Sequence, residues 1–311
     1  MLTEPPILVP PRLKAGDKIR FVSPASTPEK EAVLARAKVL ESWGFHVDFG
    51  SHAFDKFGYL AGRDEDRLAD LNEALRDPEV RAIFATRGGK GSFRISEQLD
   101  FDAVRRDPKP LVGFSDITAL HLVLWKECRL VGVHGALMDD ATWPSDTNSG
   151  GDCLFRLLTS GADYVLDARE SEPTIATTTD GLARGRLIGG NLSMIATCAG
   201  WSLPNLAGAI LLIEAVSIGI GQVDRELTML RKAGHLDGVA GFAIGQFTGF
   251  DDARYPVLVD LLRDHLGRFE VPILGGLPLG HGDWPLSVPV GAMAILDARN
   301  RRLMVSQSAL Q

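Results

Sequence analysis

Cysteine and long apolar runs are both scarce in this 311-residue sequence. Its three cysteines, Cys128, Cys153 and Cys198, have no paired spacing, so we expect neither a disulfide framework nor a cysteine zinc site. This usage fits a reducing compartment, and no stretch approaches the roughly 18 uninterrupted apolar residues of a membrane span. The first 18 residues contain Glu4, four prolines and no long apolar core, unlike a secretory signal. We therefore expect a cytoplasmic protein.

Positive charge is also in deficit, since 33 Lys and Arg residues face 40 Asp and Glu residues, a net charge of -7. A nucleic-acid backbone or an anionic membrane surface is therefore not expected to be the main partner. The 45% hydrophobic and 23% charged residues are typical of a globular protein. Glycine, in contrast, is abundant: its 33 residues are about half as many again as the usual frequency of roughly 7% predicts. Many tight turns or close backbone approaches are implied.

In the first half of the chain, short apolar runs alternate with segments of helical periodicity. We expect strands at 18–22, 46–49, 80–86 and 111–114, and helices at 28–43, 64–76 and 116–127. This alternation predicts a doubly wound, mostly parallel sheet covered by helices. Ligands bind beyond the carboxyl ends of the strands in such sheets. Two of these ends are unusual: the third strand leads into Arg87-Gly88-Gly89-Lys90-Gly91 and the fourth into Ser115-Asp116.

Between residues 143 and 179 the pattern loosens into Pro, Ser, Thr, Asn, Gly and Asp, which favours a connection between domains. The second half has apolar strands at 209–215, 238–247 and 290–296, and helices at 223–233 and 255–266. It is typical of a smaller mixed α/β, barrel-like domain. We therefore predict an N-terminal domain over residues 1–150, a linker over 151–178 and a C-terminal domain over 179–311.

Ser115 lies where an apolar strand ends and a helix begins at once. A serine on such a sharp turn is presented to solvent above the sheet, and the next backbone N–H points to where an oxyanion would form. The start of the helix adds positive potential there. Ser115 is therefore a candidate nucleophile. The alternative is a helix cap, because serine and aspartate cap helices very often and the full G-x-S-x-G signature is absent.

A serine nucleophile needs a base, and the sequence has seven histidines. His281 lies in an irregular loop whose flanking glycines allow close approach to another element. Structural or solvated positions are expected for His121, His134, His235 and His265. Glu214 follows an apolar, strand-like run, where a buried carboxylate is costly unless it is paired. Glu214 is therefore a candidate for the third member of a triad, with a salt bridge to Arg225 as the structural alternative.

The glycine loop, residues 87–91, resembles a phosphate-binding loop only superficially, because it does not match G-x-x-x-x-G-K-[ST]. Two roles stay open for it. Its glycines serve only a tight turn, or the loop donates a second backbone N–H to an oxyanion at the same sheet edge as Ser115. The sequence has no H-E-x-x-H motif and no close His/Asp cluster, so we expect neither a metal nor another cofactor.

Together these segments resemble the LD-carboxypeptidase family of serine peptidases, which includes the microcin C self-immunity proteins. The likeness covers residues 18–289 and rests on six motifs in the right order. Those in the first half are Arg87-Gly88-Gly89 with Gly91, the run 113–121 (GFSDITALH) and His134-Gly135. Those in the second half are the run 189–193 (GGNLS), Ile213-Glu214 with Asp224-Arg225, and Gly276-Leu277-Pro278 with Gly280-His281.

The resemblance implies a Ser-Glu-His triad that is split between the two domains. Ser115 is then the nucleophile, His281 the general base and later acid, and Glu214 the residue that orients His281. The backbone N–H of Asp116, together with that of Gly88 or Gly89, would form the oxyanion hole. Family members that act on murein release the terminal D-alanine from an L,D-peptide bond of a cytoplasmic tetrapeptide, which serves cell-wall recycling. The family also suggests a homodimer.

A substrate with a free carboxylate favours an Arg or Lys partner, and Arg87, Lys90 and Arg186 are candidates by location. The sequence departs from the family at three positions. Lys90 stands where relatives often have an aromatic residue, and Ile218 and Gly221 stand where they have an acidic residue and a tyrosine. The triad is untouched by these departures, but the substrate pocket is not the usual one.

Two further functions therefore stay open beside a cytoplasmic serine carboxypeptidase. One is an immunity-type amide hydrolase that cleaves a peptidyl- or aminoacyl-nucleotide antibiotic, with Trp143, Trp201 or Trp284 stacked on the base. The other is a non-catalytic protein that binds a sugar or peptide, in which Ser115 only caps a helix. All three bind a small molecule rather than nucleic acid or a membrane.

Overall fold

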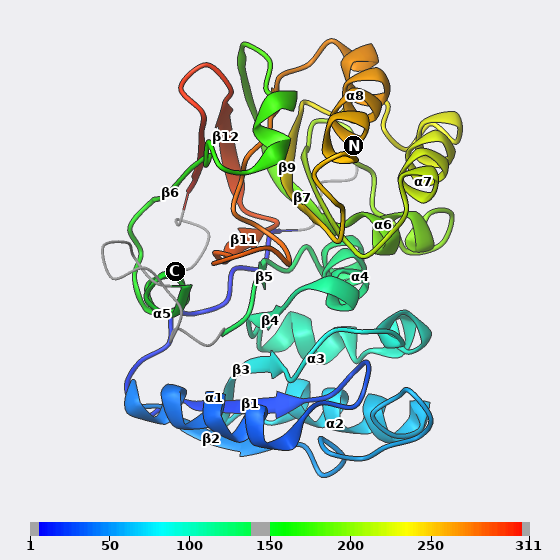
Figure 1. The fold of residues 1–311 in the computed structure, drawn as a ribbon. Coiled ribbons are helices and arrows are strands. Elements are labelled where there is room, and N and C mark those ends of the chain that lie inside the picture. Colours follow the sequence, from blue (N-terminus) through cyan, green and yellow to red (C-terminus); the bar gives the residue numbers. More distant parts are fainter. Residues whose placement is uncertain (1–5, 138–149, 307–311) are drawn as a thin grey trace, which may run out of the picture.

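The computed structural model describes residues 6–137 and 150–306. The chain forms two α/β halves that lie one above the other, each built on a sheet of its own (Figure 1). Within the described residues, no helix is both long and apolar enough to span a membrane. The predicted α/β class, with two halves in the order expected, is confirmed.

Five strands of the six-stranded N-terminal sheet run parallel, and the sixth, at one edge, is antiparallel. The strand order is β11 (Val288–Val290), β5 (Gly132–His134), β4 (Leu111–Gly113), β3 (Val80–Ala85), β1 (Lys18–Val22) and β2 (His46–Phe49). The helices of this half are α1 (Lys30–Ser42), α2 (Asp64–Arg76), α3 (Phe101–Arg106) and α4 (Thr118–Cys128). The sequence predicts this alternation well because central strands covered on both faces are nearly continuous apolar runs.

The seven-stranded C-terminal sheet is parallel on one side and antiparallel on the other. The strand order is β10 (Ile273–Leu274), β9 (Gly241–Thr248), β8 (Ile210–Val216), β7 (Leu182–Asn191), β12 (Met293–Asp297), β13 (Arg302–Val305) and β6 (Tyr164–Asp167). Its helices are α6 (Leu192–Cys198), α7 (Ile220–Lys232) and α8 (Tyr255–Leu266). Helices α4, α6, α7 and α8 pack against one another in that order, so they connect the two halves on one side (Figure 1).

The single strand expected over residues 290–296 is wrong, because the chain forms two strands there, β11 and β12, in different sheets. Gly291 lies between them with a left-handed φ of +92°, and a Cβ at this position would lie 2.7 Å from the Trp125 ring. Glycine adopts this conformation at little cost, so the chain can leave one sheet and enter the other. Pro289 lacks a backbone N–H and fits β11 because that strand lies at the sheet edge.

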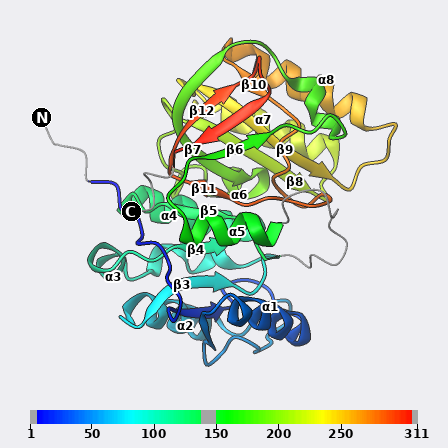
Figure 2. The same cartoon turned by 90° about the vertical axis from the view of Figure 1, so that its left-hand side faces the viewer.

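The segment 151–178 is ordered, although its composition favours a linker. It contains most of α5 (Gly150–Thr159), all of β6 and a 3₁₀ turn over Pro173–Thr177. The Phe155 ring of α5 packs against Trp43 in the N-terminal half, with 5.2 Å between centroids. Strand β6 pairs with β13 in the other half. Figure 2 shows α5 close to the N-terminal sheet and β6 in the C-terminal half. The segment is thus anchored on both halves, and the limits of the two domains stay predictions.

One apolar core runs through the boundary between the halves, since buried side chains of both belong to the same cluster. Leu122 on α4 and Ile195 on α6 are both in it. The candidate catalytic residues lie at this boundary, because Ser115 follows β4 and Glu214 lies near the end of β8.

Candidate active site

Ser115 occupies a strained backbone position. Its φ of +63° is in the left-handed region, and Phe114 before it is extended. A 3₁₀ turn over Ser115–Ile117 follows and leads directly into α4. A left-handed conformation costs a non-glycine residue roughly 1–2 kcal/mol, and such strain gathers at functional sites. The sharp strand-to-helix turn that the sequence predicts is therefore present, with Ser115 at its apex.

The glycine loop lies directly against Ser115. A Cβ at Gly88 would come within 2.6 Å of Ser115 Cβ and 2.9 Å of Ser115 Oγ. Gly89 has a φ of +107°, and a Cβ there would collide with the side chain of Ser26. Glycine is needed at both positions because the backbone approaches these serines more closely than any side chain permits. The loop is near enough to Ser115 for its amides to face a group bound to the serine.

The carboxylate of Asp116 ties the glycine loop to the turn that carries Ser115. It accepts a hydrogen bond of 2.7 Å from the Ser92 backbone N–H, and the Ser92 hydroxyl donates to the Asp116 carbonyl at 2.6 Å. Arg67, only 1% exposed, donates to the Gly91 carbonyl at 3.1 Å. Burial raises the pKa of Asp116. The Asp116 side chain is thus structural, and it is the backbone N–H of this residue that remains for chemistry.

Glu214 and His281 form a direct pair. His281 Nδ1 lies 2.7 Å from Glu214 Oε2, although the residues are 67 positions apart in the sequence. Glu214 is fully buried on β8, and its other oxygen accepts a hydrogen bond of 3.1 Å from Asn191 Nδ2. Gly280, with φ +133°, allows the His281 loop to lie against Glu214, since a Cβ there would come within 2.9 Å of Oε2. Both carboxylate oxygens are therefore satisfied, as a buried carboxylate requires.

Glu214 is paired with His281 rather than with Arg225, because the described part of the chain contains no ion pair between Glu214 and Arg225. Sequence reasoning did not single out Asn191 as the second partner. The Asn191 backbone N–H in turn donates to Thr118 Oγ1 at 3.0 Å. A chain of hydrogen bonds thus connects the start of α4 in one half with His281 in the other.

Ser115 and His281 line the same cavity, of about 310 Å³, at the boundary between the halves. The Phe114 ring lies beside the His281 ring, with 4.6 Å between centroids. Within residues 6–137 and 150–306, no hydrogen bond joins Ser115 Oγ to His281. Such bonds are often long in ligand-free enzymes and tighten when substrate binds. The fold therefore brings all three candidate triad residues to one site.

The three predicted substrate-binding cations lie in different places. Arg87 lines the cavity and donates to the Thr27 carbonyl at 3.3 Å. Lys90 is exposed and is not among the lining residues. Arg186 lies on β7 and donates to the Gly291 carbonyl at 3.4 Å, outside the lining of both cavities that contain His281. Sequence reasoning missed Arg36, a lining residue on α1, because one arginine on an amphipathic helix carries no motif.

A second cavity, of about 600 Å³, adjoins His281 on the side of the C-terminal half. Trp284 lines it and is 40% exposed. Trp201 instead donates its indole N–H to the Thr197 carbonyl and lines neither cavity, while Trp143 lies outside the described residues. Ile218 packs against the core, and Gly221 lies on α7 with open space around it, so neither lines the second cavity.

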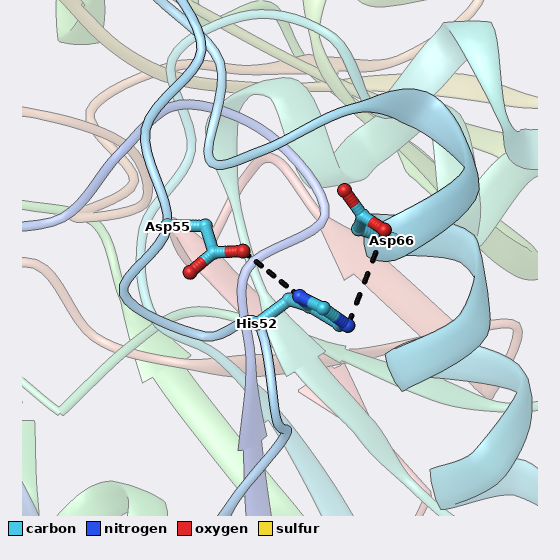
Figure 3. Close-up of side chains that lie close together, drawn as sticks. All are labelled: His52, Asp55 and Asp66. Atoms are coloured by element: carbon cyan, nitrogen blue, oxygen red, sulfur yellow. Dashed lines mark hydrogen bonds and ion pairs between the residues drawn. The ribbon is translucent and has the colours of Figure 1, made fainter.

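One cluster among the described residues has atoms close enough to hold a metal ion: His52, Asp55 and Asp66 (Figure 3). His52 Nδ1 lies 2.8 Å from Asp55, and Nε2 lies 4.0 Å from Asp66. Each ring nitrogen therefore already faces a carboxylate, and the hydrogen bond to Asp55 raises the pKa of His52. The three residues line neither cavity at His281, so the cluster has no place in chemistry at Ser115.

The similarity to known proteins covers both halves. Residues 19–135 match the model of the LD-carboxypeptidase N-terminal domain, and residues 184–296 match that of the C-terminal domain. The "Probable murein peptide carboxypeptidase" of Bacillus subtilis is 31% identical over 97% of each chain. The Microcin C7 self-immunity protein MccF of Escherichia coli is 27% identical over 100% of this chain and 98% of that one.

Solved structures agree with these matches. The crystal structure of an MccF-like protein from Bacillus anthracis has a TM-score of 0.85 and 26% identity, covering 96% of this chain and 99% of that one. Both halves and their order are thus shared with proteins of one family. The chain therefore belongs to the LD-carboxypeptidase family, and it is an enzyme of the serine carboxypeptidase type.

Proposed function

We propose that this enzyme hydrolyses an L,D-peptide bond and releases the terminal D-alanine from a murein tetrapeptide. Ser115 is the nucleophile, His281 the general base and acid, and Glu214 the residue that orients His281. The observation that carries the proposal is the bond of 2.7 Å between His281 Nδ1 and fully buried Glu214, at a cavity that Ser115 also lines. A serine, a histidine and a buried carboxylate in this order have the roles that acyl transfer requires.

The first half of the reaction forms a tetrahedral intermediate on Ser115, which becomes the acyl-enzyme when the amine leaves. Glu214 accepts a hydrogen bond from the Nδ1–H of His281, which leaves the lone pair of Nε2 free to take the proton of Ser115 as its Oγ attacks the carbonyl carbon. Negative charge then develops on the carbonyl oxygen. The backbone N–H of Asp116 and that of Gly88 or Gly89 stabilise this oxyanion, and one such donor is typically worth about 2.7–4 kcal/mol.

The second half releases the products. His281 gives the proton to the leaving amine, and D-alanine departs. Water then attacks the acyl-enzyme, with His281 as base again, and Ser115 regains its proton. Neither half requires a metal or another cofactor. The Glu214–His281 pair supports this cycle because it keeps Nδ1 protonated and stabilises the imidazolium that forms when Nε2 takes a proton.

Two features support a murein peptide as the substrate. The relative in Bacillus subtilis has a name that refers to murein peptides, and a free carboxylate at the end of a peptide suits the cationic wall formed by Arg36 and Arg87. The alternative is an amide hydrolase that removes a peptidyl or aminoacyl group from a nucleotide antibiotic. Its support is the similarity to the Microcin C7 self-immunity protein and the position of Trp284, which lines the second cavity and is 40% exposed.

The test compares the two substrates with the same purified enzyme. Incubation with the L,D-tetrapeptide should release D-alanine, which D-amino-acid oxidase detects, and Ser115→Ala should abolish the release. An enzyme that leaves the tetrapeptide intact but cleaves an aspartyl sulfamoyl adenosine supports the alternative. If Ser115→Ala releases D-alanine at the wild-type rate, the nucleophile assignment is wrong.

We also propose a cytoplasmic location and a homodimer. Three free, buried cysteines are compatible with a reducing compartment. Cell fractionation should place the enzyme in the cytosolic fraction. Small-angle scattering should give twice the mass of 33.6 kDa, and the monomer mass would refute the dimer.

A further inference from the structure

Two guanidinium groups from separate elements line the cavity beside Ser115. Arg36 is contributed by α1 and Arg87 by the glycine loop after β3. Arg36 is half-buried, and its Nη1 donates to the Thr86 carbonyl at 2.8 Å, which holds the side chain in place. Arg87 is exposed and is held more loosely, by a bond of 3.3 Å to the Thr27 carbonyl. Since a guanidinium has five N–H donors, most of those on both arginines remain available to a ligand.

These two cations have no carboxylate partner in the described part of the chain. Other arginines of the same half do: Arg20 pairs with Asp48, Arg81 with Asp107 and Arg94 with Asp64. Arg36 and Arg87 lack such a partner, so within the described residues no ion pair offsets their charge at the cavity.

Glu29 also lines the cavity, yet it forms no ion pair with Arg36 or Arg87 within the described residues. Burial lowers the pKa of Arg36, and the positive charge of Arg87 lowers it further. Two like charges at a partly enclosed wall repel each other, and an anion between them would relieve that repulsion. The wall is therefore built to receive a negative group from outside the chain.

The wall stands next to the reacting atoms. Gly88, Ser115 and His281 line the same cavity as the two arginines. An anionic group held there belongs to a part of the substrate close to the attacked carbonyl, because the whole cavity is only about 310 Å³. A carboxylate suits the planar fork of a guanidinium, which can bind both oxygens at once.

The second cavity at His281 has the opposite character. Glu172 and Asp283 line it, and its one arginine, Arg169, already donates to the carbonyls of Asp283 and Trp284. Two acidic residues and an arginine that already donates to backbone carbonyls make this cavity a poor place for a further carboxylate. The two sides of His281 are therefore unlike in charge.

We propose that Arg36 and Arg87 form a carboxylate clamp that binds the terminal carboxylate of the leaving residue and restricts the enzyme to the last peptide bond of its substrate. This proposal deepens the function proposed above and rests on it. Arg36, fixed by Thr86, is the main anchor, and Arg87 closes over the carboxylate from the loop. The remainder of the peptide extends toward the second cavity.

The test compares a tetrapeptide that has a free C-terminal carboxylate with the same peptide as a C-terminal carboxamide. Arg36→Gln should raise the KM for the free acid by roughly 10- to 100-fold, because a hydrogen bond to a charged group is lost. It should leave kcat nearly unchanged and alter the KM for the carboxamide by less than about 2-fold. Arg87→Gln, at an exposed position where folding is not at risk, should give a smaller shift in the same direction. Lys38→Gln removes one charge from the exposed side of the same helix and is the matched control.

A second arm identifies which carboxylate is bound. Peptides with Glu or Gln before the scissile bond should show the same Arg36 dependence if the clamp holds the terminus. A loss confined to the Glu peptide would overturn the assignment in favour of an acidic side chain. Equal losses on the free acid and the carboxamide, or no loss on either, would also overturn it.

A binding measurement separates this proposal from the function itself. Calorimetry on Ser115→Ala should show that D-alanine binds more tightly than D-alaninamide, and that Arg36→Gln in the same background removes the difference. Binding that is equal for the two probes overturns the clamp. An enzyme that shows the difference but releases no D-alanine from the tetrapeptide refutes the proposed substrate and leaves the clamp supported.

Discussion

The hydrogen bonds around Glu214 predict an unusual result for Glu214→Gln. The carboxylate accepts two hydrogen bonds, from His281 Nδ1 and from Asn191 Nδ2. A glutamine has one acceptor and one donor, so its amide can satisfy only one of these partners as the carboxylate does. The two possible orientations of the amide have different consequences for catalysis.

In one orientation, the glutamine oxygen accepts from Asn191 and its amide N–H faces His281. Nδ1 of His281 must then accept a hydrogen bond, so the ring proton moves to Nε2, and His281 cannot act as the proposed base. In the other orientation, His281 keeps its tautomer, but two donors face each other at Asn191. An unsatisfied buried donor costs about 1–3 kcal/mol, so the inactive orientation is favoured by that amount.

The expected loss follows from two costs. The active orientation lies about 1–3 kcal/mol higher, and the neutral amide loses roughly 1.5–3 kcal/mol of stabilisation of the imidazolium in the transition state. Their sum, about 2.5–6 kcal/mol, corresponds to a fall in kcat of about 10²- to 10⁴-fold. The fold should stay intact, because the inactive orientation leaves every partner of residue 214 satisfied.

The matching rescue is Glu214→Gln combined with Asn191→Asp. The new carboxylate accepts from the glutamine N–H, which returns the glutamine oxygen to His281 and restores the base. We expect kcat for D-alanine release to recover by roughly 10- to 100-fold over Glu214→Gln alone. Glu226→Gln is the control, since Glu226 accepts from Ser193 outside both cavities. A folded double variant without recovery, or a Glu214→Gln variant with wild-type kcat, would refute this reasoning.

Three further predictions concern the backbone and a buried histidine. Gly88→Ala should lower kcat by about 10²-fold or more, because its Cβ would lie 2.6 Å from Ser115 Cβ and displace the proposed oxyanion donor. Gly267→Ala is the control, because a Cβ there would have no atom within 4 Å. The free energy of unfolding in urea should be about 0.5–1 kcal/mol higher for Ser115→Gly than for Ser115→Ala. The reason is the left-handed φ of +63° at residue 115, which strains alanine but not glycine. Burial lowers the pKa of His121 to about 4, so between about pH 6.5 and 4 this imidazole binds a proton in the unfolded state but not in the folded state. His121 by itself should therefore lower the free energy of unfolding by roughly 1.4 kcal/mol for each unit by which the pH falls through that range.

Each of these has a clear contrary outcome. Equal activity of Gly88→Ala and Gly267→Ala would mean that the glycine loop does not position a donor. A Ser115→Gly variant no more stable than Ser115→Ala would mean that the turn is unstrained. A His121→Gln variant should lose the acid slope assigned to His121, and an unchanged slope in urea titrations from pH 7 to 4.5 would assign the acid sensitivity to other groups.

Local pattern was enough to predict most of the N-terminal half. The strand Lys18–Val22 and the helix Asp64–Arg76 have the bounds that periodicity predicts. The spacing of apolar residues within each element determines which face it buries, so no distant contact is needed to predict it. The turn at Ser115 was predicted for the same reason. The proposed triad as a set, in contrast, came from the resemblance to a family, since nothing local connects Ser115 with residues 214 and 281.

What periodicity missed depends on contacts between distant segments. The strand Val288–Val290 pairs with β5, and nothing within its own sequence says which sheet it joins. The order of the segment 151–178 likewise comes from contacts such as that of Phe155 with Trp43. A segment rich in Pro, Ser, Thr, Asn, Gly and Asp has a low propensity for helix or strand, but burial against another element overrides that propensity.

The sequence by itself determined the two α/β halves, the position of Ser115 on a sharp turn and the family of the enzyme. Only the tertiary structure decided that Asn191 donates the second hydrogen bond to Glu214 and that Arg36 and Arg87 line the same cavity. The physical reason is the range of the interactions. Periodicity and turn chemistry act over a few residues, whereas a buried carboxylate or an unpaired guanidinium acquires its role from groups that only folding brings near.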